Sequence, residues 1–360
     1  MSDLLSDGDV IDDRYRVENY LAQGGMQYVY VALDKTTGRK VALKTPKNAS
    51  ARKRFRRSAL VAARVNHPNV AKTLDYIEDN GMTFLVEELI EGSDLKSALM
   101  SRSDFVDPYL VARVFHHLAK AVAAAHHTGV VHRDLKPTNV MVVGGYNVES
   151  LKVTDFGIAK MAGAEMEEAI EGGDETLSAS ATAVGALPYM APEAIDTPET
   201  VGLPSDIWSL GAMMFHLLSG QFPFGSGLRA VPKIMAAELP NVSSFVTSKN
   251  QFRPLAKEIL NIIGSCLRKD PTERPSADAL VELCNALCYT VSERSIGRVY
   301  EFRHNAWGFI RGPEGDVFYH KNSVYGPLPV KGDDVLYSCY ESEQSPRALP
   351  VVKLKKAEQA

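Results

Sequence analysis

The octapeptide HRDLKPTN, residues 132–139, holds three chemically useful side chains within six positions. Asp134 can accept a proton, Lys136 can neutralise a developing negative charge, and Asn139 can hold a metal ion through its amide oxygen. Phosphoryl transfer needs such groups, because the protein there mainly positions the reactants and stabilises charge. The stretch therefore predicts a phosphoryl-transfer centre, and the segments on either side must supply the rest of it.

The composition is that of an ordinary globular protein. The 360 residues are 45% hydrophobic and 23% charged, which argues against overall disorder. This length predicts two or three folding units. The net charge of −4 gives no general attraction to nucleic acid or anionic lipid, so a basic surface would have to be local. No apolar run approaches the roughly 20 residues that span a bilayer. We expect a cytoplasmic protein with no membrane partner.

Three regions of different pattern follow one another along the chain. Residues 10–90 predict strands with one helix, and Gly38 and the pair Asn80-Gly81 mark hairpin turns. Residues 93–290 are mostly helical, with a long helix that begins near Pro108 and ends at Gly129. Within them, residues 163–182 are acidic and rich in small residues, which predicts a mobile loop. Short strands from about residue 295 predict a small all-β barrel.

Several ordered motifs show that residues 12–288 resemble a eukaryotic-type (Hanks-like) Ser/Thr protein kinase domain of bacteria. They are VALK at 41–44, HRDLKPTN at 132–139, DFG at 155–157 and APE at 191–193, followed by DIWSLG and DPTERPS. The resemblance implies an α+β bilobal protein-kinase fold over residues 10–290. Its N-lobe would be residues 10–90, its C-lobe residues 91–290, and its activation segment residues 155–193. The small all-β barrel, of OB type, would follow this domain.

The same resemblance implies roles for individual residues. Asp134 would accept or orient the proton of a protein serine or threonine hydroxyl, and Lys136 would lie against the transferred phosphoryl group. Asn139 and Asp155 would hold Mg²⁺ through oxygen atoms. ATP would contact a set that includes the strand lysine: Leu21, Gly24, Val29, Ala42, Lys44, Glu88, Ile90 and Met141. Glu193 and Arg274 would form a structural ion pair in the C-lobe.

Two departures from the family pattern concern Lys44. The helix position that normally supplies its glutamate partner holds Ser58, and the residue before the hinge, usually apolar, is Glu87. A buried carboxylate there would be costly unless it were paired. We hypothesise that Glu87 pairs with Lys44 in place of the missing glutamate. The alternative is that the hinge is shifted by one residue and Glu87 points to solvent.

Two further departures affect the supports of the site. Ala22 and Gln27 replace the first and third glycines of the glycine-rich loop, and Ala186 replaces a threonine that usually bridges Asp134 and Lys136. These changes keep a second interpretation open, a pseudokinase scaffold that binds nucleotide or partners without catalysis. Arg133 could receive a phosphate from the activation segment. The candidate acceptors are Thr176, Ser178, Ser180 and Thr182.

The C-terminal segment, residues 295–357, resembles a cold-shock domain. NAWGFI at 305–310 and DVFYHKNSV at 316–324 are similar to its two nucleic-acid-binding motifs. Strand alternation places Trp307 and Phe309 on one face, and likewise Phe318 and His320. The resemblance implies that single-stranded RNA or DNA stacks on these rings. Glu301 stands where the family has a stacking tryptophan. A barrel that binds protein or packs on the kinase is the alternative, and the sequence leaves the protein substrate and oligomeric state open.

Overall fold

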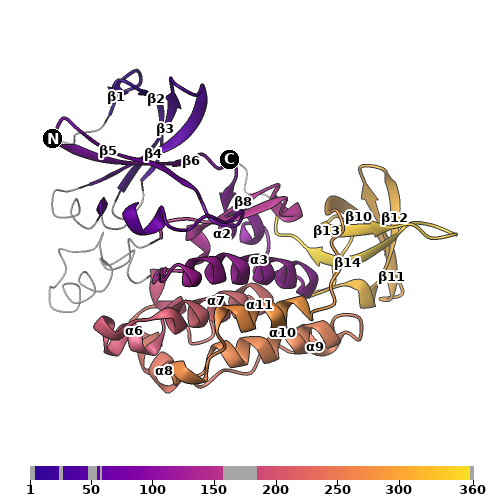
Figure 1. Cartoon of the computed structure of the whole chain (residues 1–360). Helices are drawn as coiled ribbons and strands as arrows, with labels where there is room; N and C mark the ends of the chain where they lie inside the picture. The colour runs from indigo at the N-terminus through magenta and orange to yellow at the C-terminus, as the bar shows by residue number, and fades with distance from the viewer. Residues whose placement is uncertain (1–4, 24–26, 48–54, 57–58, 157–184, 357–360) are drawn as a thin grey trace.

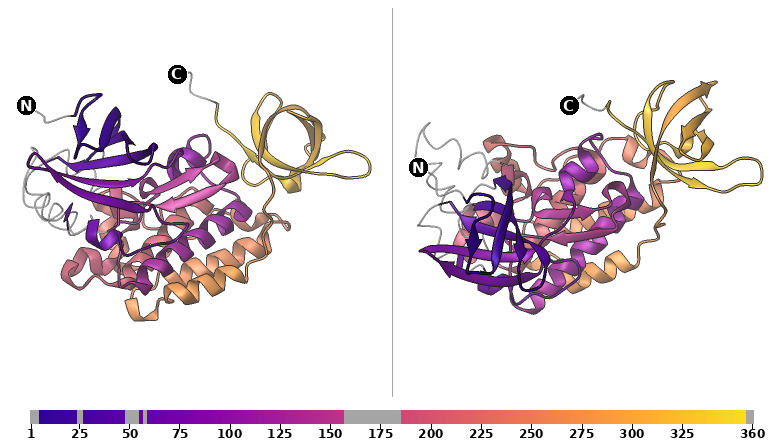
Figure 2. Two further views of the ribbon diagram at one scale, coloured as in Figure 1. Left: turned by 45° about the horizontal axis from the view of Figure 1, so that its top comes forward. Right: turned by 90° about the horizontal axis from the view of Figure 1, so that it is seen from above.

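The computed structural model describes residues 5–23, 27–47, 55–56, 59–156 and 185–356. Within these ranges an N-terminal sheet is followed by a helical part and then by a closed barrel (Figure 1). In both views of Figure 2 the barrel lies beside the helical part and away from the N-terminal sheet. The three regions that the sequence pattern predicts are therefore all present.

The N-terminal sheet has the strand order β1-β2-β3-β4-β6-β5, and all of its strand pairs are antiparallel. Tight turns join its strands where predicted, because Gly38, Asn80 and Gly81 all have positive φ. Phe55 and Ala59, both in helical conformation, pack against Leu85 on the sheet. The strands are β1 (Val10–Ile11), β2 (Tyr15–Gln23), β3 (Gln27–Asp34), β4 (Arg39–Pro46), β5 (Thr73–Asp79) and β6 (Met82–Glu88).

The helical part is built around two central helices, α3 (Pro108–His127) and α7 (Leu203–Ser219). Asp107 caps α3 by accepting hydrogen bonds from two backbone N–H groups, and Gly129 follows its end with positive φ. Residues 205–219 of α7 are all buried, as expected for a helix that is apolar on every side. The other helices are α2 (Leu95–Met100), α6 (Pro192–Asp196), α8 (Val231–Ala236), α9 (Phe245–Ser248), α10 (Arg253–Cys266) and α11 (Ala277–Asn285).

A small sheet and an ion pair stabilise this part. The sheet has the order β7-β8-β9, and β8 follows directly on the octapeptide. Arg274 donates two hydrogen bonds, of 2.6 and 2.9 Å, to the carboxylate of Glu193, which confirms the predicted pair. The strands are β7 (Ser93–Asp94), β8 (Val140–Val143) and β9 (Ser150–Val153).

The barrel closes in the order β10-β11-β12-β14-β13, with β13 pairing back to β10. Only β12 and β14 are parallel among the strand pairs of this barrel, whose residues all lie within the described range. A β-bulge interrupts β10 between Val299 and Glu301. The strands are β10 (Ser295–Arg303), β11 (Trp307–Gly312), β12 (Gly315–His320), β13 (Asp334–Tyr340) and β14 (Arg347–Lys353).

The barrel packs tightly on the helical part through an aromatic docking cluster. Tyr325 lies edge-on to Phe105, Phe245 and Phe252, with ring centroids 5.2–5.6 Å away. Its hydroxyl donates to the Leu218 carbonyl at the end of α7, at 2.7 Å. The cluster is fully buried at Tyr325 and gives the two parts a common hydrophobic core.

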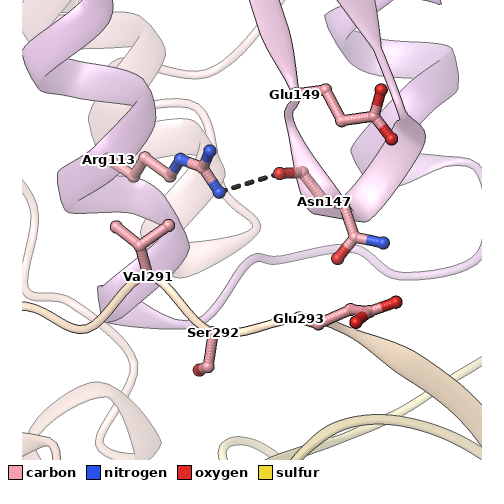
Figure 3. Close-up of a pocket in the computed structure, with 6 residues that line it drawn as sticks. All are labelled: Arg113, Asn147, Glu149, Val291, Ser292 and Glu293. Atoms are coloured by element: carbon pink, nitrogen blue, oxygen red, sulfur yellow. Dashed lines mark hydrogen bonds between the residues drawn. The ribbon is translucent and has the colours of Figure 1, made fainter.

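Ion pairs surround this apolar contact. Arg294, just before the barrel, pairs with buried Asp107, the cap of α3, at 3.0 Å. Arg102 pairs with Asp334 on β13 at 2.8 Å. Beside this junction a cavity of about 240 Å³ lies between the helical part and the connecting segment (Figure 3). It contains none of the site residues predicted from sequence; its lining is Arg113, Asn147, Glu149, Val291, Ser292 and Glu293.

Candidate active site

Lys44 lies at the centre of a buried charge cluster. Its Nζ atom is 2.6 Å from Glu87 Oε2 and 2.9 Å from Asp155 Oδ1. The side chains of Lys44 and Glu87 are only 8% and 5% exposed. Burial of an ammonium group is tolerated when carboxylates of good geometry surround it. The structure therefore gives Lys44 two anionic partners.

Strand register explains why Glu87 reaches Lys44. Lys44 on β4 is directly opposite Leu85 on β6, and Ala42 is directly opposite Glu87. Residues two apart on a strand share a face, so Lys44 and Glu87 are diagonal neighbours on one side of the sheet. The solvent-facing alternative for Glu87 is wrong, because the side chain points to the buried face. Ser58 lies outside the described residues.

The charges in this cluster do not balance. Burial raises the pKa of Glu87, and Lys44 opposes that rise. Burial also acts against the charge of Lys44, but Asp155 and Glu87 outweigh it and raise its pKa. For Asp155, burial is outweighed by Lys44 and Gln27, so its pKa is lowered. Two carboxylates around one ammonium leave an excess of negative charge, which suits a divalent cation.

The octapeptide forms a compact loop between α3 and β8. Asp134 Oδ2 lies 2.8 Å from Lys136 Nζ and accepts a hydrogen bond from Asn139 Nδ2 at 3.0 Å. Ala186 is buried and has no hydroxyl to bridge the first pair. Asp134 and Lys136 instead contact each other directly, so the loss of the threonine leaves the pair assembled.

Asp206, on α7, holds the backbone of this loop. Its carboxylate accepts the N–H groups of His132 at 2.9 Å and Arg133 at 2.8 Å. Arg133 has φ of 69°, a conformation that an L-residue adopts only when its surroundings compensate the strain. This role was not predicted from the sequence, although the DIWSLG motif begins with Asp206 and offers the signal.

The two predicted metal ligands are neighbours. The N–H of Thr154, next to Asp155, donates to the Asn139 carbonyl at 2.9 Å. His132 binds the same segment through its Nε2 atom, 2.8 Å from the Thr154 carbonyl oxygen. Asn139 and Asp155 offer two oxygen-bearing side chains, and Mg²⁺ commonly takes its remaining ligands from phosphate and water. The donor set fits a magnesium–nucleotide complex.

The predicted ATP contacts are spread over both parts of the site. Leu21 on β2 is 51% exposed, whereas Ala42 on β4 is buried. Val29 on β3 and Met141 on β8 are half-buried. The Glu88 side chain is held by Lys152 at 2.8 Å and by the Lys72 N–H at 2.7 Å, so its backbone is the part left for a ligand.

Of the remaining predicted residues, only Ile90 is described by the structure. Ile90 follows β6 and is half-buried. Gly24 lies outside the described residues, as do the candidate phosphorylation sites Thr176, Ser178, Ser180 and Thr182 and the predicted loop of residues 163–182.

The barrel brings its four predicted aromatic residues together. Trp307 is opposite His320, and Phe309 is opposite Phe318 across β11 and β12. The rings of Trp307, Phe309 and Phe318 have centroids 5.8–6.1 Å apart and are half-buried. We call these four residues the aromatic platform.

Tyr300 extends the platform and was missed in the sequence. Its ring stacks on Phe309 with centroids 6.0 Å apart. Tyr300 follows inward-facing Val299 and therefore faces outward, and the bulge after Val299 makes Glu301 the residue that pairs with Phe309. The guanidinium groups of Arg311 and Arg303 lie over Tyr300 and Trp307, respectively. The resemblance to the cold-shock domain points only to Glu301 on this strand.

Comparison with known proteins identifies the larger part. The family described as protein kinase domain matches residues 15–283, so the chain belongs to this family. The serine/threonine-protein kinase PrkC of Bacillus subtilis is 31% identical over 277 residues, covering 74% of this chain and 39% of that protein. The serine/threonine-protein kinase pkn2 of Myxococcus xanthus is 30% identical over 303 residues, covering 79% and 34%.

A solved structure shares the fold. A mutant of the PknI kinase domain from Mycobacterium tuberculosis is similar with a TM-score of 0.57 and 22% identity, covering 78% of this chain and 98% of that one. The chain spans only about a third of the length of the curated relatives, 34% of pkn2 and 39% of PrkC. Among the residues that the structure describes, we find no helix of the length and apolarity needed to cross a membrane.

Proposed function

We propose that the chain is an ATP-dependent serine/threonine protein kinase that works with Mg²⁺. In this proposal residues 10–290 form the kinase domain, with an N-lobe of 10–90, a C-lobe of 91–290 and an activation segment of 155–193. Bound Mg²⁺ would neutralise phosphate charge. Asp134 would orient the hydroxyl of the protein substrate and take up its proton, while Lys136 would stabilise the transferred group.

The buried contact of Lys44 with Glu87 carries this proposal. This chain has Ser58 where the family has a glutamate, and that difference is the main argument for a scaffold without catalysis. At 2.6 Å Glu87 compensates the charge of Lys44 from a neighbouring strand. The charged side chains of Asp134, Lys136 and Asp155 and the amide of Asn139 are the further groups that support this proposal.

The test is phosphate transfer by purified protein. Wild-type protein is incubated with γ-labelled ATP, Mg²⁺ and a general protein substrate, beside the Asp134→Asn variant. We expect label on protein serine or threonine with the wild type alone. Equal labelling of both proteins, or of neither, would contradict the proposal and favour the scaffold.

We also propose that residues 295–357 form an OB-type barrel similar to a cold-shock domain, which binds single-stranded RNA or DNA. Two observations support this. The strands close in the order first-second-third-fifth-fourth with a parallel third–fifth pair. The aromatic platform lies on the second and third strands, the face that OB folds use for oligonucleotides. The barrel contacts the helical part mainly through β13, β14 and Tyr325, so this docking leaves the platform to another partner.

A change in fluorescence anisotropy of labelled single-stranded oligonucleotides tests the second proposal. We expect RNA or DNA of mixed sequence to bind, since stacking has little sequence preference. Absence of binding at low salt would favour a protein partner for the platform.

A further inference from the structure

Gln27 stands where the kinase family has the third glycine of its glycine-rich loop. It begins β3 and lies opposite Pro46 on β4. Its side chain is buried, with the residue only 7% exposed. The amide Nε2 donates to Asp155 Oδ1 at 2.9 Å, the same oxygen atom that accepts from Lys44. A residue of the loop is thus joined directly to a predicted metal ligand.

Among the described residues, the other end of the Gln27 amide has no protein partner. Its Oε1 atom is buried and makes no hydrogen bond within the described part of the chain. Leaving a buried acceptor unpaired costs about 1–3 kcal/mol, so a native structure usually offers a reason for it. Glycine at this position would avoid that cost. The oxygen therefore points to a ligand that occupies the site during function.

The charge around Gln27 indicates which ligand this is. Lys44 lies between Glu87 and Asp155, so the cluster carries more negative than positive charge. A cation bound by Asp155 would restore the balance, and amide oxygens are good ligands for hard cations. A neutral oxygen also adds a ligand without a further carboxylate to desolvate.

We propose that Gln27 belongs to the magnesium site of the nucleotide complex. Its amide N–H orients Asp155, and its amide oxygen supplies a further oxygen ligand to the cation that Asp155 and Asn139 hold. The inference rests on the proposed kinase function, and it adds to the site a residue from the loop that departs most from the family pattern.

Calorimetric titration with ADP, with and without Mg²⁺, tests this role without relying on turnover. The wild type is compared with Gln27→Ala, Gln27→Glu and the control Ala22→Gly, which alters the same loop at an exposed position. We expect Gln27→Ala to reduce the Mg²⁺-dependent gain in ADP affinity by about 10-fold, the lower end for groups that support a metal. Metal-free ADP binding should change less than about twofold, and Ala22→Gly should keep the full gain.

The Gln27→Glu variant tests whether the side-chain oxygen at position 27 binds the metal or the side chain only fills space. A carboxylate oxygen at this place should keep or increase the Mg²⁺-dependent gain, and should raise Mn²⁺ affinity measured by electron paramagnetic resonance. If Gln27→Glu abolishes the gain, or if Gln27→Ala keeps all of it, the inference is wrong. Binding without phosphate transfer by the wild type would reject the kinase proposal alone, whereas transfer with an unaffected Gln27→Ala gain would reject the inference alone.

Discussion

At the scale of single residues, the site depends on a carboxylate that comes from a different position than in the kinase family. Glu87 occupies a strand position that is usually apolar, and its cost of burial is met by Lys44 at 2.6 Å. The pair works because both residues lie on one face of adjacent strands. The anionic partner that Lys44 needs is thus supplied by a strand of the sheet.

Replacing Glu87 by methionine should disable the nucleotide site. Lys44 would lose the nearer of its two buried carboxylate partners and keep only Asp155, which should lower the free energy of unfolding by about 3 kcal/mol. We expect MgATP affinity, measured calorimetrically, to fall at least about 10-fold. The control Glu78→Met removes a more exposed carboxylate of the same sheet and should be near neutral.

A double variant tests whether the loss comes from the missing partner of Lys44. Adding Ser58→Glu to Glu87→Met restores the family's own arrangement and should recover much of the lost MgATP affinity. An unchanged affinity in the single variant would show that Glu87 has no part in holding Lys44.

His216, on α7, should make folding sensitive to acid. Burial lowers its pKa to about 4, with Lys96 adding to the effect and Asp104 opposing it. In the unfolded chain His216 has an ordinary pKa near 6.5, so between about pH 4 and 6.5 its ring binds a proton there but not in the folded protein. Stability is therefore full above about pH 6.5 and falls as the pH drops toward 4, by on the order of 3 kcal/mol from this residue.

Urea unfolding at pH 7.5 and pH 5 measures this effect. Gln in place of His216 can still share a hydrogen bond with the Tyr189 hydroxyl, which lies 2.9 Å from His216 Nδ1 in the wild type. We expect His216→Gln to lose less stability than the wild type between the two pH values. Equal losses would mean that His216 does not resist protonation in the folded state.

At the scale of elements, the sequence predicted regular features better than irregular ones. Hairpin turns at Gly38 and Asn80-Gly81, and the start and end of α3, follow from local chemistry and were predicted. The bulge in β10 was not, because alternation assumes a period of two. Asp206 was also missed, since its partners lie far away in the chain. Signals within a few neighbouring residues predict helices, strands and turns, whereas contacts between distant residues, such as that of Asp206 with His132, depend on the assembled fold.

The prediction for the barrel is that the aromatic platform on β11 and β12 is its binding surface. Trp307→Ala should weaken binding of single-stranded oligonucleotides by about 1–3 kcal/mol, roughly 5- to 150-fold. The barrel should remain folded, because Trp307 is half-buried and lies outside the hydrophobic core. Val330→Ala, at an exposed loop position, is the control. Unchanged binding by Trp307→Ala would show that the platform is not the binding surface.

Salt should affect this binding only modestly. Arg303 is paired with Glu301, and Arg311 with Asp316 at 3.1 Å, so these two cations beside the platform already have partners. The slope of affinity against salt counts the phosphates that a protein neutralises. We expect a slope corresponding to about two phosphates or fewer. A steep slope would place the binding surface elsewhere.

At the scale of the whole molecule, the barrel and the helical part share one hydrophobic core. Leu336, Val352 and Leu354 from the barrel segment belong to the same buried cluster as the residues of α3 and α7. The kinase-family match ends at residue 283, before this contact begins. Because Tyr325 and Arg294 fasten the barrel to the ends of α7 and α3, we expect the two parts to unfold together.

Two glycines with nearly the same backbone allow this coupling to be measured. Gly326 has φ of 94° and Gly332 has φ of 92°, so alanine should cause similar backbone strain at both. A Cβ atom at Gly326 would lie 2.2 Å from the ring of Phe105, whereas at Gly332 nothing lies within 4 Å. Gly326→Ala therefore adds a clash in the docking cluster that Gly332→Ala lacks.

We expect Gly326→Ala to lower the free energy of unfolding by about 1–3 kcal/mol more than Gly332→Ala, the usual cost of overpacking. Since Phe105 must move away from Tyr325, calorimetry should also show the single transition of the wild type dividing into two, with protease cleavage appearing in residues 286–294. Gly332→Ala should keep one transition at a slightly lower temperature. If both variants shift by the same amount and neither transition divides, the strain lies only in the backbone and the barrel is not held by this cluster.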